Sequence, residues 1–403
     1  MIPLLNRHNR KICIIFLSLF TSFLLTGCWD RKEVNDMALV LGAAIDKEKG
    51  ENIKLTLQIL IPRVVSAGLQ GGGGGGGGGP LVLTRSAVGE NMADAASKLQ
   101  TKFPRRIFWG HCKIYIIGKK LAKSGEVHKQ IDFLLRHPEP RERAYLFVSE
   151  GEANKILDLE PPLERYQGDV LRKLTEMHIG VDITVKDFEQ MLIGDAGTAL
   201  LPLINKLPPS LGQKKDETIA FMIGTAIFKK DKMVGQIDTK STRGIMWLRN
   251  EIEVTAVTVS PKKGETITLD PIRETSKLVP SIYKGKWKVL LQITSEGTIV
   301  QNGTNLDLMS PIITKEIEKE LDKDIKQRID LSIKEVKQGM NLDVFGFADA
   351  FHRKYPKEWE KVKDRWDEVL PKVDVKIDIK TRIRRPGLST TPAGFKEEEV
   401  EKE

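Results

Sequence analysis

Histidine and cysteine are the side chains of this sequence that most readily take part in chemistry, and their spacing argues against catalysis. The chain of 403 residues holds six histidines and three cysteines. No two histidines have the His-x-x-x-His or His-Glu-x-x-His spacing of a zinc site, and no cysteine pair could complete one. His111 and Cys112 suggest a thiol and its base, but neighbours on a strand point to opposite faces. We therefore expect no catalytic, metal-binding or cofactor-binding residue and no cofactor.

Cys28 is the residue whose surroundings predict a covalent modification. It ends the stretch Leu25-Thr26-Gly27-Cys28, which closes an apolar run that begins at Ile12 and follows three basic residues. This run is about half the length that a helix needs to cross a bilayer, so residues 1–27 are typical of a secretory signal peptide. A Leu, two small or polar residues and Cys end a lipoprotein signal. We predict that Cys28 is the lipidated first residue of the mature chain; an ordinary signal or a short uncleaved anchor is the alternative.

Length and charge point to a protein of several domains at a membrane surface. Removing 27 residues from 403 leaves 376, enough for two or three cores. The whole chain carries +9 and the signal holds three of the positive charges, which leaves +6. Acidic residues lie among the basic ones throughout, which suits an anionic membrane better than nucleic acid. No stretch after Cys28 has the roughly 20 uninterrupted apolar residues of a membrane span.

The region 28–150 predicts a mixed α/β domain with a long loop. Apolar residues alternate from Ile53 to Ile59, as on a strand with one buried face, and we expect further strands at 81–84, 107–117 and 143–148 with a helix at 90–101. Nine glycines, Gly71–Gly79, interrupt this region. A phosphate-binding loop would need a Lys or a helix start at fixed spacing, which is absent here, so we expect a mobile surface loop.

The rest of the chain predicts a second small domain at 151–250 and a third at 251–386. In the second, we expect helices at 152–158 and 165–177 and a β-hairpin at 218–237. In the third, we expect strands at 252–259, 266–269, 289–294 and 373–383, a long amphipathic helix from Ile313 to Val336 and a second helix from Lys357 to Leu370. Trp359 and Trp366 on that second helix could stack a ligand, but helical spacing favours a core role.

We therefore expect an α+β fold of about three domains, ending in an antiparallel-rich sheet with two amphipathic helices packed on it. The tail 387–403 has too few apolar residues to bury anything, so we expect it to be disordered.

Several short blocks, weak alone but specific in their order and spacing, resemble one known family. They cover nearly the whole mature chain and are Cys28-Trp29-Asp30-Arg31 with Glu33-Val34-Asn35-Asp36, Gly110-His111-Cys112-Lys113, Asp132-Phe133 to Arg136 with Arg141-Glu142-Arg143, Asp343-Val344-Phe345-Gly346-Phe347, and Tyr355-Pro356-Lys357-Glu358-Trp359 to Trp366. The sequence closely resembles the Ger(x)C family, the C-subunit lipoproteins of bacterial nutrient germinant receptors.

The resemblance implies a lipid-anchored, non-enzymatic receptor subunit on the outer face of the spore inner membrane. It implies integral membrane A and B subunits as partners and a role in assembly and in the response to germinants. It names no nutrient. Two alternatives from other classes are a solute-binding lipoprotein of a membrane transporter and a surface lipoprotein hydrolase. The first usually has two similar lobes after a polar linker, and the second needs a nucleophile or metal motif; neither feature is seen in the sequence.

Overall fold

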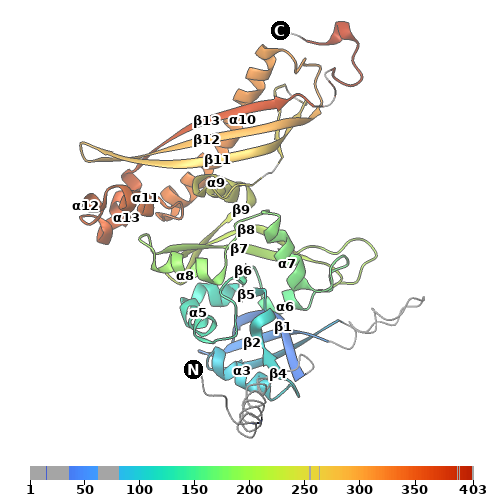
Figure 1. The fold of residues 1–403 in the computed structure, drawn as a ribbon, viewed down its shortest axis with the longest axis vertical. Coiled ribbons are helices and arrows are strands. Elements are labelled where there is room, and N and C mark those ends of the chain that lie inside the picture. Colours follow the sequence, from blue (N-terminus) through green and yellow to red (C-terminus); the bar gives the residue numbers. More distant parts are fainter. Residues whose placement is uncertain are drawn as a thin grey trace, which may run out of the picture.

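The structure is a computed structural model that describes residue 15 and residues 36–61, 81–253, 256–262, 264–387, 389 and 391–401. The predicted lipid attachment site at Cys28, the signal peptide apart from Ile15, and Gly71–Gly79 lie outside these residues. The molecule is elongated, with one sheet in its N-terminal body and a second sheet in its C-terminal body (Figure 1).

The N-terminal body is built on a nine-stranded sheet with a parallel centre. The strand order is β3-β2-β1-β5-β6-β7-β8-β9, with β4 pairing β1 off this path. The pairs from β1 through β5 and β6 to β7 are parallel, and the flanking pairs on both sides are antiparallel. The strands are β1 (Met37–Lys47), β2 (Ile53–Leu60), β3 (Val82–Gly89), β4 (Arg106–Phe108), β5 (Ile114–Gly118), β6 (Tyr145–Ser149), β7 (Thr198–Lys206), β8 (Ala220–Lys229) and β9 (Lys232–Asp238).

Helices cover both faces of this sheet, so its central strands are buried on both sides. The residues of α3, α5 and α8 pack into one hydrophobic core, and those of α6 and α7 pack into another. All five residues of β5 are buried, as expected for a parallel strand covered by helices. The helices are α3 (Met92–Gln100), α4 (Lys119–Ser124), α5 (Val127–Arg136), α6 (Ala153–Leu157), α7 (Gln167–Glu176) and α8 (Val185–Ile193).

The sheet continues across residue 150, where the sequence suggested a domain boundary. Val148 and Ser149 of β6 pair with Leu203 and Ile204 of β7. Residues 28–150 and 151–250 therefore share one sheet instead of forming two sheets. The crossover between β6 and β7 contains α6, α7 and α8. The hairpin predicted at 218–237 is confirmed as β8 and β9.

The C-terminal body confirms the expected α+β class with its antiparallel-rich sheet. The strand order is β10-β11-β12-β13, in which β10–β11 and β11–β12 are antiparallel and β12–β13 is parallel. The predicted helix is α10, and its stripe of Ile and Leu residues is buried against the sheet. The elements are α9 (Thr239–Arg249), β10 (Val257–Val259), β11 (Ile267–Tyr283), β12 (Lys286–Asn302), α10 (Pro311–Ser332), a π-helix (Ile333–Met340), α11 (Phe347–Lys354) and β13 (Asp374–Arg385).

The segment predicted as a second long helix, Lys357 to Leu370, consists of short helical turns. They are α12 (Pro356–Trp359), η4 (Lys363–Arg365), α13 (Trp366–Val369) and η5 (Leu370–Lys372). Hydrogen bonds from Val362 to Trp359 and from Arg365 to Val362 tighten the chain into three-residue steps. Trp359 and Trp366 are buried with their rings 5.1 Å apart, so the prediction of a core role is confirmed.

Two further expectations about the C-terminal body need correction. β11 and β12 each run for 17 residues, far beyond the short strands expected there. The tail was predicted to be disordered, and this is wrong for its described residues. Its backbone pairs with the loop after β12, where the Glu401 amide donates to the Asn305 carbonyl over 3.0 Å and the Asp307 amide donates to the Glu401 carbonyl over 2.8 Å. Backbone pairing of this kind needs no apolar residues, which explains why composition did not reveal it.

Candidate functional site

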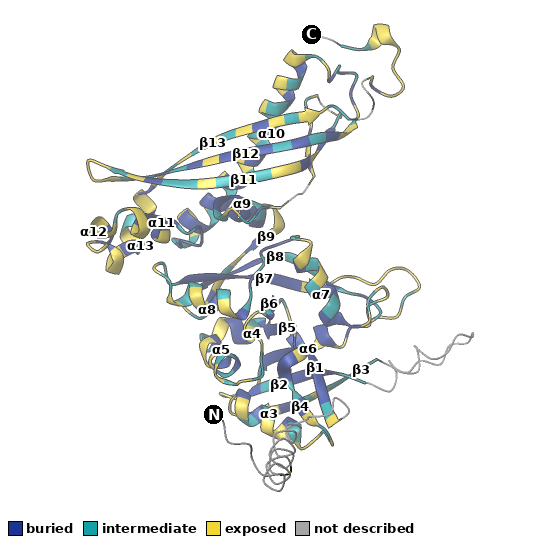
Figure 2. Ribbon diagram, viewed as in Figure 1, coloured by how far each residue is buried: buried dark blue, intermediate teal, exposed yellow. Residues whose placement is uncertain are grey.

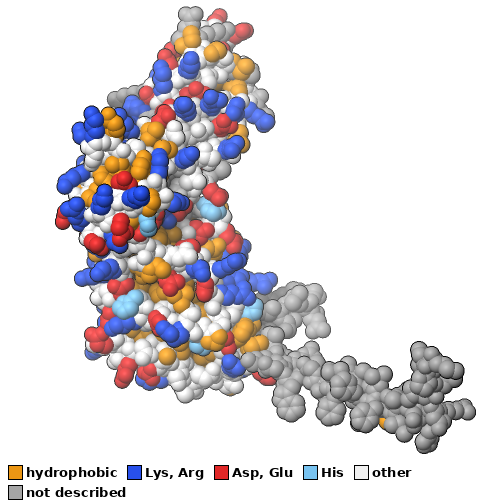
Figure 3. Space-filling view, turned by 60° about the vertical axis from the view of Figure 1, so that its left-hand side comes forward, with side chains coloured by type: hydrophobic (Ala, Val, Ile, Leu, Met, Phe, Trp, Pro, Cys, Tyr) orange, Lys and Arg blue, Asp and Glu red, His pale blue; other side chains and the backbone are white. Residues whose placement is uncertain are grey.

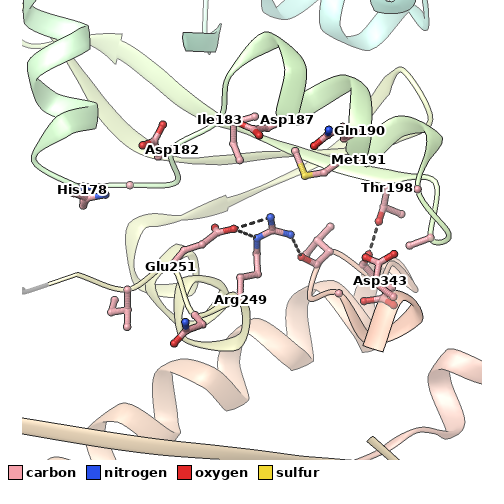
Figure 4. Close-up of a pocket in the computed structure, with 18 of the residues that line it drawn as sticks. His178, Asp182, Ile183, Asp187, Gln190, Met191, Thr198, Arg249, Glu251 and Asp343 are labelled. Atoms are coloured by element: carbon pink, nitrogen blue, oxygen red, sulfur yellow. Dashed lines mark hydrogen bonds and ion pairs between the residues drawn. The ribbon is translucent and has the colours of Figure 1, made fainter. Parts of the chain in front are cut away.

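A cleft of about 690 Å³ lies between the two bodies and is the place where polar side chains from both converge (Figure 4). One wall comes from the segment between α7 and α8, from α8 itself and from the start of β7. The other comes from the end of α9, β11 and the loop that leads into α11. The labelled residues are His178, Asp182, Ile183, Asp187, Gln190, Met191, Thr198, Arg249, Glu251 and Asp343.

Asp343 is the most buried carboxylate of the cleft, and its bonds shape the loop before α11. One oxygen accepts the amides of Phe345 and Phe347 at 3.2 and 3.1 Å. The other accepts the Ala348 amide at 2.7 Å and the indole N–H of Trp366 at 3.1 Å. Burial raises the pKa of Asp343, although these four donors act in the opposite direction. Through these four bonds, the Asp343 carboxylate fixes the conformation of the loop before α11.

Arg249 joins the end of α9 to the same loop. Its guanidinium donates from Nε to Glu251 at 2.8 Å, and Nη2 lies 2.7 Å from the same carboxylate oxygen. Its Nη1 donates to the carbonyl of Val344 over 3.1 Å. The guanidinium therefore bonds to two groups of the C-terminal body, the Glu251 carboxylate and the Val344 carbonyl.

Side chains also connect the two bodies directly around the cleft. The Thr198 hydroxyl at the start of β7 donates to the carbonyl of Asp343. The imidazole of His352 in α11 lies 2.5 Å from the carboxylate of Asp195, in the turn between α8 and β7. Lys229, at the end of β8, pairs with Asp367 of α13. These contacts bridge the two bodies at three places.

Three further carboxyl groups of the cleft resist ionisation because they are partly buried. Burial raises the pKa of Asp182, Glu274 and Asp349. For Glu274 the value is about 7, because the Ser295 hydroxyl and the charge of Arg243 offset burial only in part. These three carboxyl groups therefore take up protons more readily than free ones.

The described part of the chain brings no catalytic constellation together in this cleft. Its residues supply no Ser or Cys nucleophile with a base, and no group of three His, Cys, Asp or Glu within the described ranges could hold a metal ion. The side chains of Asp343 and Arg249 form bonds that position the loop before α11. We conclude that the cleft connects the two bodies structurally.

Of the adjacent residues His111 and Cys112, the first is exposed and the second is buried in the core. The predicted strand 107–117 is in fact β4, a short turn at Trp109–His111 and β5, so the two residues leave a turn instead of alternating on a strand. Cys112 is buried, its thiol donates to the Ile114 carbonyl over 3.3 Å, and burial raises its pKa to about 12. A thiol that stays protonated at neutral pH is a poor nucleophile.

The sequence predicted a lipid attachment site at Cys28 and gave no sign of the cleft. Cys28 lies outside the described residues, so its modification stays a prediction. Asp182, Arg249, Glu274 and Asp343 come from distant parts of the chain, and no local pattern marks them as neighbours. Within the described ranges, no helix is both long and apolar enough to cross a membrane.

Comparison with known families and proteins places both halves of the chain among spore germination proteins. The family described as "Spore germination protein N-terminal domain" matches residues 30–206, and "Spore germination B3/ GerAC like, C-terminal" matches residues 223–387. The chain is similar to spore germination protein KC of Bacillus subtilis (strain 168), with 30% identity over 400 residues, 95% of this chain and 98% of that one. It is also similar to spore germination protein B3 of the same organism, with 26% identity, 93% of this chain and 96% of that one.

A solved structure has the same fold. The crystal structure of the GerBC protein superposes with a TM-score of 0.58 at 20% sequence identity and covers 85% of this chain and 97% of the other. At this identity the likeness concerns the arrangement of the elements.

Proposed function

Since this chain belongs to the Ger(x)C family of spore germination proteins, we propose that it is the lipid-anchored C subunit of a nutrient germinant receptor. The observation that carries the proposal is the match of both family halves, which together span most of residues 30–387. The subunit would sit on the outer face of the spore inner membrane and act in receptor assembly and in the response to germinants. Its partners would be the integral membrane A and B subunits.

The proposed anchor is Cys28, and chain length supports a position of the N-terminal body close to the bilayer. β1 begins at Met37, nine residues after Cys28. Nine residues span at most about 30 Å when fully extended. Two or three acyl chains together give stable attachment where a single chain is marginal. Confinement at this distance raises the effective concentration towards any integral partner, so modest interfaces suffice for assembly.

The proposed role is non-enzymatic, and the bonds of two cleft residues support it. The carboxylate of Asp343 and the guanidinium of Arg249 are engaged with the chain itself. The face visible in Figure 3 mixes acidic, basic and apolar side chains. The alternative of a solute-binding transporter lipoprotein gains no support from the relatives reported above, which are spore germination proteins.

Substitution of Cys28 tests the proposal. In spores that carry Cys28→Ala, we expect an unprocessed or poorly anchored protein in membrane fractions and a loss of germination in response to nutrients. The reason is that Cys28 is the one cysteine placed directly after the predicted signal peptide. Cys112→Ser is the matched control, since a serine hydroxyl can keep the bond to the Ile114 carbonyl. A Cys28→Ala protein that is still lipidated, and spores that still germinate, would contradict the assignment.

A further inference from the structure

β13 is an edge strand of the C-terminal sheet, and half of its free edge is closed by acidic side chains. It pairs with β12 alone and lies along the margin of the sheet in Figure 1. Asp322 and Glu318 of α10 accept the amides of Thr381 and Ile383, each over 2.9 Å. These amides point away from β12, because a strand directs the backbone groups of alternate residues to opposite sides. The capped half of β13 is therefore unavailable for a further strand.

The opposite edge of the sheet is protected as well. β11 carries Pro271 and Pro280, which have no amide hydrogen. The Ser276 amide donates to the Asn250 side chain over 2.6 Å, and Lys354 donates to the Pro280 carbonyl over 2.8 Å. Helices α9 and α11 contact β11 on this side. Beyond the short strand β10, prolines, side chains and helices thus protect part of this edge.

The first half of β13, residues 374–380, keeps an open edge. By the same alternation that directs the amides of Thr381 and Ile383 outward, the backbone groups of Val375, Ile377 and Ile379 face away from β12. The pairing of β13 with β12 shows no bulge between Asp374 and Ile383, so the alternation holds along this stretch. No side chain among the described residues is found to accept the amides of these three residues. An unpaired edge of this kind is a template for another strand.

The charges on this open stretch are complementary to themselves. Asp374, Lys376, Asp378 and Lys380 are exposed on one face of β13, and Val375, Ile377 and Ile379 are half-buried on the other. In an antiparallel pair centred on Ile377, Asp374 would lie opposite Lys380 of a second copy, and Lys376 opposite Asp378. Val375 would lie opposite Ile379. Charges that only keep an edge strand from aggregating do not need to alternate in sign in this way. Charges of a single sign would repel the same segment of a second copy.

We propose that residues 374–380 of β13 pair antiparallel with the same segment of a second copy of this chain, joining two C-terminal sheets into one. About six backbone hydrogen bonds would form, because the three outward-facing residues of each strand exchange both of their bonds. The contact is small, and Asp374 already lies 3.9 Å from Lys288, so the dimer is weak in dilute solution. Confinement on a membrane strengthens such a contact, and this last point alone rests on the proposed anchoring at Cys28.

A charge swap tests this pairing in the full-length protein, purified from membranes in detergent and followed by sedimentation over a range of concentrations. In Lys376→Glu, the new carboxylate faces Asp378 of the second copy, and in Asp378→Lys, the new ammonium faces Lys376. The contact between residues 376 and 378 occurs twice in the symmetric pair, so each substitution changes two contacts. We expect either variant to weaken self-association about tenfold. The double variant restores opposite charges and should return to within about twofold of the unchanged protein.

Lys323→Glu on the exposed face of α10 is the matched control and should leave self-association unchanged. Melting curves establish that each variant stays folded, as expected for exposed positions. The proposal is overturned if the unchanged protein does not self-associate, if the single variants associate normally, or if the double variant is as weak as they are. None of these outcomes depends on germination, so they separate this proposal from the receptor assignment.

Discussion

The two bodies of this molecule use their sheets in opposite ways. In the N-terminal body, helices cover both faces of the sheet, and the central strand β5 is buried along its whole length. In the C-terminal body, the long strands alternate between buried and exposed residues, and β13 has hardly a buried position (Figure 2). The first sheet is the inside of a domain. The second sheet has many positions that are exposed to solvent.

This difference has a physical origin in how the strands are connected. Parallel strands need crossover helices, which lie on the faces of the sheet and bury it. The antiparallel β11 and β12 are joined by a tight hairpin at Lys284 and Gly285, so no helix is required over their outer face. One sheet is therefore buried on both faces, and the other keeps positions that are exposed to solvent.

The largest expected effect comes from truncating a buried side chain of the N-terminal sheet. Phe147 of β6 is fully buried, and Phe147→Ala should lower the free energy of unfolding by about 3–5 kcal/mol. Ile377 of β13 is half-buried, and Ile377→Ala should cost only about 1 kcal/mol. Urea unfolding, with separate probes for each body, measures both changes. Equal losses at the two positions would remove the distinction between the bodies.

A smaller effect, with a defined pH dependence, is expected at Glu274 in the cleft. Because burial raises its pKa from 4.5 to about 7, the folded protein holds this proton more tightly than the unfolded chain does. Its contribution to stability is thus fully present below about pH 4.5 and is lost as the pH rises to about 7. Glu274→Gln keeps an amide in place of the carboxyl and avoids that loss. It should stabilise the protein by roughly 2–3 kcal/mol at pH 8 and by almost nothing at pH 4.

Thermal melting at the two pH values checks this prediction, with Glu320→Gln on the exposed side of α10 as the control. A Glu274→Gln protein that is less stable than the unchanged one at pH 8 would show that the carboxylate is ionised and stabilising there. The cleft would then be an ion-pair network between Glu274 and Arg243 instead of a partly neutral acidic surface.

Local features of the fold could be predicted from the sequence, and non-local ones could not. The stripe from Ile313 to Ile329 predicted α10, and the alternation of apolar residues predicted β2 and β13, because both patterns depend on neighbours in the chain. The continuation of the sheet from β6 to β7 depends on pairing across about 50 residues, which no local pattern encodes. The same holds for the pairing of Glu401 with Asn305 and Asp307.

The site residues divide in the same way. Cys28 could be predicted as a lipid attachment site because a lipoprotein signal is a local pattern in the sequence. Arg249, at the end of α9, reaches the carbonyl of Val344 next to Asp343 only after folding, and both residue types are common on any surface. The charges of β13 were visible in the sequence, but their meaning depends on which strand lies at the edge.

The most direct test of the proposed function is an affinity purification of this protein, with a tag at its C-terminus, from solubilised spore inner membranes. We predict that two polytopic membrane proteins co-purify with it in constant proportion, and that the Cys28→Ala protein recovers much less of both. Recovery of transporter components, or of no integral membrane protein, would contradict the assignment of this chain as a subunit of a germinant receptor.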